Sequence, residues 1–341
     1  MSSRQGGSAA GADPTAAQRI VRTVLGDISV TALGTTLGHE HLIARPPAFV
    51  TDEDLWLDSE AAALTELNDF RSTGGRGVVE MTTVDYGRDI AALVRLSQAS
   101  GVHLIAATGF NQGKFADGIV ARHSDEQIVA WMVSEVSTGA LDYGASEHFN
   151  LASGDSMGPG RPRAGVIKAS SGLDGPGAGE QRVLEAAVEA QRLTRAPIST
   201  HTERATWGLE QAHFFSAAGV PSSSVLIGHL DFRPELPYLL EVAETGVNLG
   251  FDQFSKRKYL SDQKRVELIV GLAEAGHLGQ VILSGDLARR SYWPAYGNEA
   301  ATGFAYIPGK VREMLLAAGL GVDGVEQLLT GNPQNWLAFV A

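Results

Sequence analysis

Two histidines separated by a single residue stand in the stretch Thr-Thr-Leu-Gly-His-Glu-His, residues 35–41. Successive side chains of a β-strand point to opposite faces, so a strand here places His39 and His41 on one face and Glu40 on the other. Two imidazoles on one face can hold a metal ion. In a chain with nine histidines such a pair also arises by chance, so its meaning depends on what lies near it in the fold.

Four further residues that could bind a metal or carry charge also end apolar, β-branched runs. They are Lys168 in Gly-Val-Ile-Lys, His201 in Ser-Thr-His-Thr, His229 in Ile-Gly-His and Asp286 in Leu-Ser-Gly-Asp. The chain has no cysteine, so nitrogen and oxygen atoms must hold any metal. Any one of these residues alone is more often a hydrogen-bonded core or ion-paired side chain. Their joint placement at strand ends favours a metal centre.

Eight apolar runs, most of them followed by a helical pattern, must position these residues. The runs are continuous rather than alternating, which is typical of a parallel sheet covered by helices. The strands are predicted over residues 35–41, 77–82, 102–109, 164–170, 196–202, 224–230, 246–251 and 280–286, and the helices over 59–72, 88–100, 125–138, 179–193, 207–218, 234–245, 262–275, 310–318 and 324–329. Eight units and the lack of a G-x-G-x-x-G or Walker A pattern favour an α/β fold of the (β/α)8 TIM-barrel type over a doubly wound sheet. In such a barrel all six candidate residues meet at one rim.

The chain ends and the composition set further expectations. Residues 1–18 are rich in Gly, Ser and Ala and predict a flexible tail, and residues 19–32 a short β-hairpin before a single domain over 19–341. A formal charge of −12 argues against a nucleic-acid or anionic-membrane surface. No apolar run approaches the roughly 18 residues of a membrane span, and the start lacks a signal-peptide pattern, so a cytoplasmic location is the default expectation.

Together these five motifs resemble the phosphotriesterase family of the amidohydrolase superfamily, from about residue 19 to the end of the chain. The resemblance implies a binuclear centre. His39, His41 and Asp286 would bind the more buried ion and His201 and His229 the more exposed one. Lys168, carboxylated by carbon dioxide to a carbamate, would bridge both. The metals are expected to be zinc, with manganese, cobalt or iron as alternatives, and the assembly a homodimer.

The implied chemistry is metal-dependent hydrolysis. Metal binding lowers the pKa of water, so that a metal-bridging hydroxide can attack a lactone or carboxylic ester at neutral pH. Lys168 as a carbamate replaces an ammonium that two dications would repel. Asp286, a ligand and a hydrogen-bond acceptor, is expected to take the proton of the hydroxide. Glu40 is expected to form a structural salt bridge, and Glu80 either to support the site or to pack.

Basic residues after the seventh and eighth runs suggest where an anionic substrate group could bind. They are Lys256, Lys258, Arg289 and Arg290, and the alternative is a solvated run of charge. The surrounding sequence is similar to the branch of the family that contains phosphorylated-sugar lactonases and phosphotriesterase homology proteins. A phosphorylated sugar lactone is therefore one expected substrate. Residues 287–307, rich in Gly and aromatics, predict a lid or a segment packed on the last helices.

Three departures from relatives bear on the substrate. Organophosphate-degrading members carry a histidine where Gln253 stands and an acidic residue where Phe232 stands, and lactonases that act on acyl-homoserine lactones have a tyrosine near Asn111. These gaps favour a different lactone, ester or amide. The alternatives that stay open are a phosphotriesterase or amidase on the same centre, a mononuclear deaminase, and a metal-binding barrel without turnover.

Overall fold

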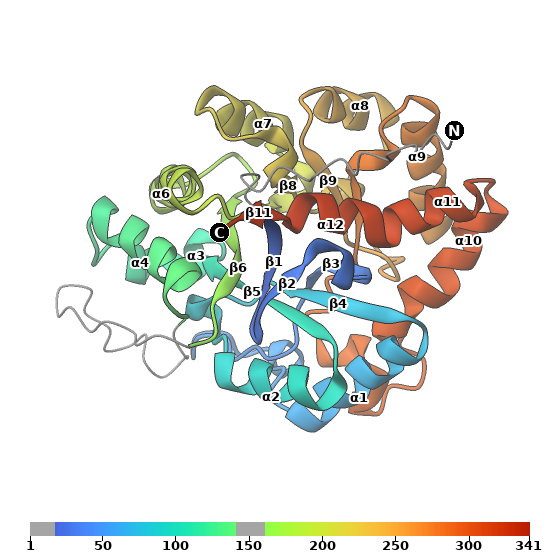
Figure 1. The fold of residues 1–341 in the computed structure, drawn as a ribbon, viewed down its shortest axis with the longest axis horizontal. Helices are drawn as coiled ribbons and strands as arrows, with labels where there is room; N and C mark the ends of the chain where they lie inside the picture. Colours follow the sequence, from blue (N-terminus) through green and yellow to red (C-terminus); the bar gives the residue numbers. More distant parts are fainter. Residues whose placement is uncertain (1–17, 141–160) are drawn as a thin grey trace, which may run out of the picture.

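Eight parallel strands form the barrel that the sequence predicts, in a computed structural model that describes residues 18–140 and 161–341 (Figure 1). The predicted TIM barrel is confirmed. In order around the barrel the strands are β3 (Thr35–Glu40), β4 (Gly75–Glu80), β5 (His103–Gly109), β6 (Ala164–Ser171), β7 (Ile198–Thr202), β8 (Val225–Ile227), β9 (Asn248–Phe251) and β10 (Val281–Leu283). The predicted tail, residues 1–18, lies outside the described residues except for its last position.

Hydrogen bonds between the ends of β3 and β10 complete the barrel. The backbone N–H of Asp286 donates to the carbonyl of His39 at 3.1 Å, and the His39 N–H donates to Ser284 Oγ at 2.9 Å. The Glu40 carboxylate accepts from Ser284 Oγ and from the backbone N–H groups of Gly285 and Leu287, at 2.7 to 2.8 Å. No cation of the described chain pairs with Glu40, so the expected salt bridge is wrong: this carboxylate joins the first and last strands through neutral donors.

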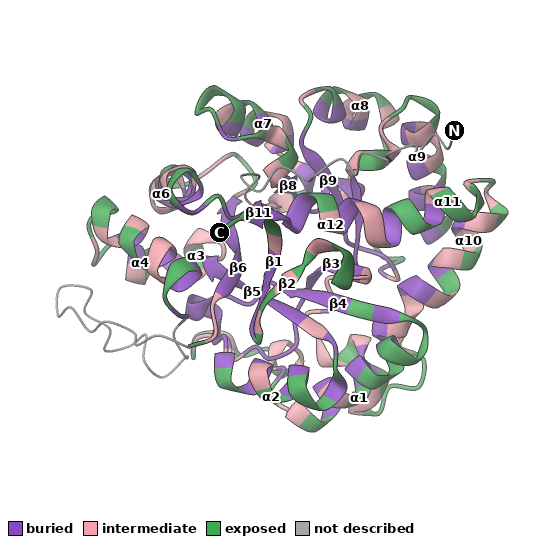
Figure 2. Cartoon of the chain, viewed as in Figure 1, coloured by how far each residue is buried: buried purple, intermediate pink, exposed green. Residues whose placement is uncertain are grey.

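Helices surround the barrel with one face buried and the other exposed (Figure 2). They are α1 (Glu60–Ser72), α2 (Ile90–Ser100), α3 (Gly113–Val120), α4 (Asp125–Ser137), α6 (Ala178–Thr194), α7 (Gly208–Ala217), α8 (Leu236–Glu244), α9 (Asp262–Glu274), α10 (Arg312–Ala317), α11 (Gly321–Glu326) and α12 (Asn332–Leu337). Side chains of Ser59, Asp89, Ser124 and Ser261 cap α1, α2, α4 and α9 by accepting from free N–H groups of the first turn. The sequence patterns missed α3 and α12.

Two hydrophobic cores hold this arrangement. The larger lies between the strands and the helices, and the smaller fills the barrel interior with inward side chains such as Val79, Ile105, Val166 and Ile282. The predicted hairpin, β1 (Arg19–Thr23) and β2 (Gly26–Ser29), pairs with β11 (Phe339–Val340) in a separate antiparallel sheet. Val24 N–H donates to the carbonyl of Leu104 near the start of β5, so this sheet lies at the amino-terminal end of the barrel and leaves the opposite rim open.

The segment predicted as a lid or a packed segment, residues 287–307, is largely packed. Trp293 is fully buried against Phe304, with ring centroids 5.3 Å apart. Glu66 on α1 accepts from the backbone N–H groups of Ala295 and Phe304, at 3.0 and 3.2 Å. The segment is therefore held on α1 rather than on the last helices. No helix of the described residues is apolar and long enough to span a membrane.

Candidate metal centre

His39, His41 and Asp286 come together at the carboxyl-terminal rim of the barrel. Asp286 Oδ1 lies 3.4 Å from His41 Nε2 and 3.9 Å from His39 Nε2. Ligand atoms about 2.0–2.1 Å from a tetrahedral Zn²⁺ stand roughly 3.3 Å apart, so these three atoms are close to the spacing that one ion requires. The three residues thus fit a metal site.

Three of the candidate residues, His41, His229 and Asp286, lie outside the strands in which the sequence analysis placed them. β8 ends at Ile227 and β10 at Leu283, while His229 and Asp286 follow in left-handed backbone conformations with φ of 61° and 45°. Such angles are uncommon for non-glycine residues and persist where the surroundings impose them. Here the left-handed residue stands two positions beyond β8 and three beyond β10, where the chain leaves the barrel wall at the rim. His41 also follows its strand, which has a register irregularity against β4 between Leu37 and Glu40.

Lys168 lies on β6, buried beside the first three residues. Its Nζ is 3.3 Å from His39 Nε2. Burial lowers the pKa of Lys168 to about 8, although the carboxylates of Asp286 and Asp252 oppose that shift. Gly109 on β5 allows this approach, since a Cβ there would lie 2.1 Å from the Lys168 carbonyl oxygen. The lysine is therefore held in the interior, among imidazoles.

The remaining two histidines continue the row of rings. His229 has its ring centroid 4.8 Å from that of His39 and 4.6 Å from that of His201. Burial lowers the pKa of His201 to about 4 and holds that of His39 well below its ordinary value. Burial also lowers the pKa of His41. These three imidazoles are neutral at pH 7, which is the form that binds metals.

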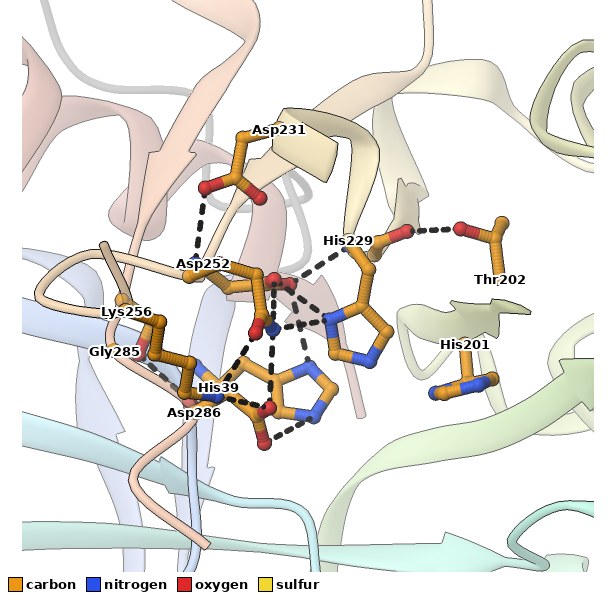
Figure 3. A network of polar contacts seen from close by, with 12 residues as sticks. His39, His201, Thr202, His229, Asp231, Asp252, Lys256, Gly285 and Asp286 are labelled. Carbon is orange, nitrogen blue, oxygen red and sulfur yellow. Dashed lines mark hydrogen bonds and ion pairs between the residues drawn. The ribbon is translucent and has the colours of Figure 1, made fainter. Parts of the chain in front are cut away.

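Hydrogen bonds on the outer ring nitrogens determine which atoms face the centre. His41 Nδ1 lies 2.8 Å from Thr82 Oγ1. His229 Nδ1 lies 2.7 Å from Asp252 Oδ1, as Figure 3 shows. His39 Nδ1 is 3.6 Å from the other oxygen of Asp252 and has no hydrogen-bond partner within the described residues. The hydrogen bonds leave Nε2 of His41 and His229 to the centre, as carboxylates and hydroxyls do for histidine ligands in metal sites. The Nε2 atom of His39 faces Asp286 and Lys168 without such a bond on Nδ1.

His201 is oriented the other way. Its Nε2 contacts the side-chain amide of Gln112 and lies 3.5 Å from Glu203 Oε2. The same amide of Gln112 donates to Glu203 at 2.8 Å. The ring is thus held from its Nε2 side, which leaves Nδ1 to the centre.

Asp252 is the buried acidic residue that the sequence analysis missed. It follows β9 and accepts the backbone N–H of His229 at 3.0 Å as well as the ring contact. Burial raises its pKa, but the His229 and His39 rings more than offset this, so the pKa of Asp252 lies well below its ordinary value. The rule that selected Asp286, an acidic residue at the end of a predicted strand, could have found it if extended by one residue past the strand predicted over 246–251.

Asp286 is ionised and surrounded by donors. Its Oδ2 accepts from Lys256 Nζ at 2.6 Å and from Gln253 Nε2 at 3.0 Å (Figure 3). Burial raises the pKa of Asp286, but Lys256 and the histidines hold it well below its ordinary value. One oxygen therefore faces the histidines and the other faces Lys256.

Glu80, for which the sequence left two readings, supports the backbone beside the site. Its carboxylate accepts from the N–H groups of Leu42 and Thr82. Burial raises the pKa of Glu80 to about 8, and burial likewise raises that of Glu40 to about 7.

An open pocket lies over the exposed side of these residues. Its cavity volume is about 140 Å³, and it opens to solvent. His201, His229 and Asp286 form part of its floor, and Lys256 and Arg289 part of its walls. The pocket suits a small substrate.

The four basic residues expected at the substrate site divide into two pairs. Lys256 and Arg289 line the pocket, while Lys258 and Arg290 are not among its lining residues. Arg290 instead donates to the Trp56 carbonyl and to Asp58, at 2.5 and 2.7 Å. Lys258 is exposed, near the rings of Tyr259 and Tyr292.

Comparisons with known proteins agree with this geometry. A model of the phosphotriesterase family matches residues 19–337. The phosphotriesterase homology protein of Escherichia coli is 32% identical over 310 residues, 91% of this chain and 99% of that protein. The phospho-furanose lactonase of Mycoplasmopsis synoviae is 31% identical, over 94% of this chain and 92% of that protein. A crystal structure of an amidohydrolase from Mycoplasma synoviae superposes with a TM-score of 0.87 at 31% identity, over 94% of this chain and 92% of that one.

Proposed function

This chain belongs to the phosphotriesterase family of metal-dependent hydrolases, and on that basis we propose that it is a binuclear lactonase or carboxylic esterase that acts on an anionic substrate. The observation that carries the proposal is the convergence of His39, His41, His201 and His229 with Lys168 and Asp286 at one rim, below an open pocket. The outer ring nitrogens of His41, His229 and His201 have polar partners, so the other nitrogen of each ring points to the proposed metal site.

The donor set fits two divalent ions. His39, His41 and Asp286 would hold one, and His201 and His229 the other, with a carbamate on Lys168 between them. Carbamate formation joins the neutral amine of Lys168 to carbon dioxide and releases one proton, which leaves an anion with two oxygens. When bound, zinc or another divalent ion polarises the carbonyl of the substrate and lowers the pKa of water. Asp286 would accept a proton on Oδ2, the oxygen that contacts Lys256 and Gln253.

Gln253 supports an acyl substrate over a phosphotriester. Its side-chain nitrogen donates to Asp286, 3.0 Å away, and a neutral amide does not pass a proton onward as a histidine at this position could. Phe232 lines the pocket where organophosphate-degrading relatives carry an acid. A phosphotriesterase, an amidase and a non-catalytic barrel remain the alternatives, and the homodimer and cytoplasmic location remain predictions.

The anionic character of the substrate is supported by the pocket and by one relative. Lys256 and Arg289 bring positive charge to the walls in a protein of net charge −12. The lactonase from Mycoplasmopsis synoviae is named for a phosphorylated furanose. A sugar lactone that carries a phosphate is therefore the leading substrate.

A substrate panel on metal-quantified protein tests the proposal. We expect turnover of lactones above that of esters, amides and phosphotriesters, loss of turnover after chelation, and recovery when zinc, manganese or cobalt is added back. The rates are measured by pH-stat titration and the metals by mass spectrometry. Two bound ions without hydrolysis of any member would favour the non-catalytic barrel, and one ion per chain would favour the mononuclear deaminase.

Replacing Asp252 with asparagine tests how the histidines are oriented. The amide keeps the shape but removes the charge that accepts the proton on His229 Nδ1, so we expect metal affinity to fall by about 10- to 100-fold. Affinity is measured by competition with a chromophoric chelator, and thermal unfolding of the metal-free protein reports on folding. The control is Asp125→Asn, at an exposed residue paired with Arg182. Unchanged affinity in the Asp252 variant would contradict this role.

A further inference from the structure

Arg204 is a pocket cation that the sequence analysis did not select. It lies in the turn η5 (Glu203–Ala205) directly after β7, three residues beyond His201, and lines the same pocket as Lys256 and Arg289. Within residues 18–140 and 161–341, no acidic side chain forms an ion pair with it. Its guanidinium is thus available to a ligand.

The other cations around this pocket are already paired. Lys256 contacts Asp286 at 2.6 Å, and Arg289 contacts Asp52 and Asp54 at 2.7 and 3.2 Å. Lys256 and Arg289 therefore keep cationic donors on the pocket walls but share their charge with carboxylates of the protein. Arg204 adds a positive charge that no carboxylate of the described residues shares.

The carboxylate next to Arg204 in the sequence does not compensate it either. Glu203 is engaged by the Gln112 amide at 2.8 Å and by His201 at 3.5 Å. The two neighbouring side chains therefore have different partners: Glu203 contacts the candidate metal centre, and Arg204 faces the pocket. Arg204 is exposed and has no acidic partner among the described residues, so an anion in the pocket can pair with it.

The backbone that presents Arg204 is strained. Arg204, Ala205 and Trp207 have φ of 53°, 59° and 62°, and none is a glycine. The left-handed conformation costs about 1–2 kcal/mol per non-glycine residue. Two contacts hold the turn: Thr206 Oγ1 donates to the Glu203 carbonyl at 2.6 Å, and Tyr238 Oη donates to the Ala205 carbonyl at 3.2 Å. Strain of this kind concentrates where a fixed side-chain position serves function.

We propose that Arg204 determines specificity by binding an anionic oxygen group of the substrate, such as a carboxylate, sulfonate or phosphate. The inference rests on the proposed hydrolase function and identifies the residue that selects the anionic substrate class. A guanidinium suits this task because its planar, forked donors match two oxygens of such a group. The strained turn fixes the backbone position from which Arg204 reaches the pocket.

Paired substrates test the assignment. The probe is a lactone ring that carries a carboxylate, compared with the same lactone as its neutral methyl amide, with kcat and KM measured for both. In Arg204→Gln we expect kcat/KM for the carboxylated lactone to fall by about 10- to 100-fold, mainly through KM, while the neutral lactone changes less than about twofold. Arg204→Lys should recover part of the loss, since it keeps the charge but not the forked donors.

Two further variants separate recognition from folding. Arg204→Gly removes the side chain and relieves the strained φ, so it should unfold at a higher temperature and still lose the preference for the carboxylated lactone. Arg192→Gln is the matched control, because Arg192 is exposed on α6, paired with Glu189 and outside the lining of the pocket. Its kinetics should match the wild type.

The outcomes distinguish this inference from the function on which it rests. An active wild type whose Arg204→Gln variant loses both lactones equally, or neither, overturns the role of Arg204 and leaves the hydrolase intact. A wild type with two metal ions that hydrolyses no lactone, ester or amide overturns the proposed function itself.

Discussion

Replacing Lys168 with alanine should remove the second metal ion and most of the activity. The Lys168 side chain is the only group of the site that the proposal places between both ions, and its Nζ lies 3.3 Å from His39 Nε2 in the buried interior. Activation of water and substrate by metals is worth several kcal/mol, so we expect kcat/KM to fall by at least about a thousandfold. Metal content, measured by mass spectrometry, should fall from about two ions per chain to one or fewer.

A small carboxylic acid should partly restore the activity of the Lys168→Ala variant. Acetate or propionate can place a carboxylate where the carbamate stood, so activity and the second ion should return in part with increasing acid concentration. Lys264→Ala is the control, at an exposed lysine of α9 paired with Glu267, and it should behave as the wild type with or without acid. A fully active Lys168→Ala variant that retains two ions would contradict the proposal that Lys168 bridges the metals.

Replacing Asp286 with asparagine should have an effect of similar size through a different route. Asp286 places one oxygen 3.4 Å from His41 Nε2 and the other 2.6 Å from Lys256 Nζ. Loss of the carboxylate therefore weakens the binding of one metal ion and removes the proposed proton acceptor. Removing a general base typically reduces kcat by about 10²- to 10⁴-fold. We expect a loss in kcat within or above this range.

The measurements for Asp286→Asn are kcat at saturating metal and the metal content of the same sample. Asp323→Asn, at an exposed position in the first turn of α11, is the control for the loss of one carboxylate. If kcat survives when both metal sites are full, Asp286 does not accept the proton. If kcat is lost with both sites still full, its role as proton acceptor is separated from its role as ligand.

The barrel and the six candidate residues could be predicted because both follow from local patterns. Parallel strands of a barrel end on one side, so residues that close apolar runs must meet wherever they stand in the chain. His39 and Asp286 are far apart in sequence, yet the backbone of one donates to the backbone of the other. No knowledge of the loops was needed to bring them together.

The surroundings of the site could not be predicted in the same way. Gln112 reaches His201 from a different loop, and Arg289 and Arg290 turn to carboxylates of residues 52–58, more than 200 positions earlier. Such ion pairs decide which basic residues line the pocket. The sequence shows the charged residues but not which of them pair with one another, so the lining could not be predicted. The strained turn at Arg204 also leaves no sequence signal, because arginine rarely adopts that conformation.

A crystal structure of the protein grown with zinc and bicarbonate tests the central claim most directly. The account predicts two ions, the first bound by His39, His41 and Asp286 and the second by His201 and His229, with continuous density for a carboxylated Lys168 between them. A single ion, or an unmodified Lys168 that points away from the imidazoles, would contradict it.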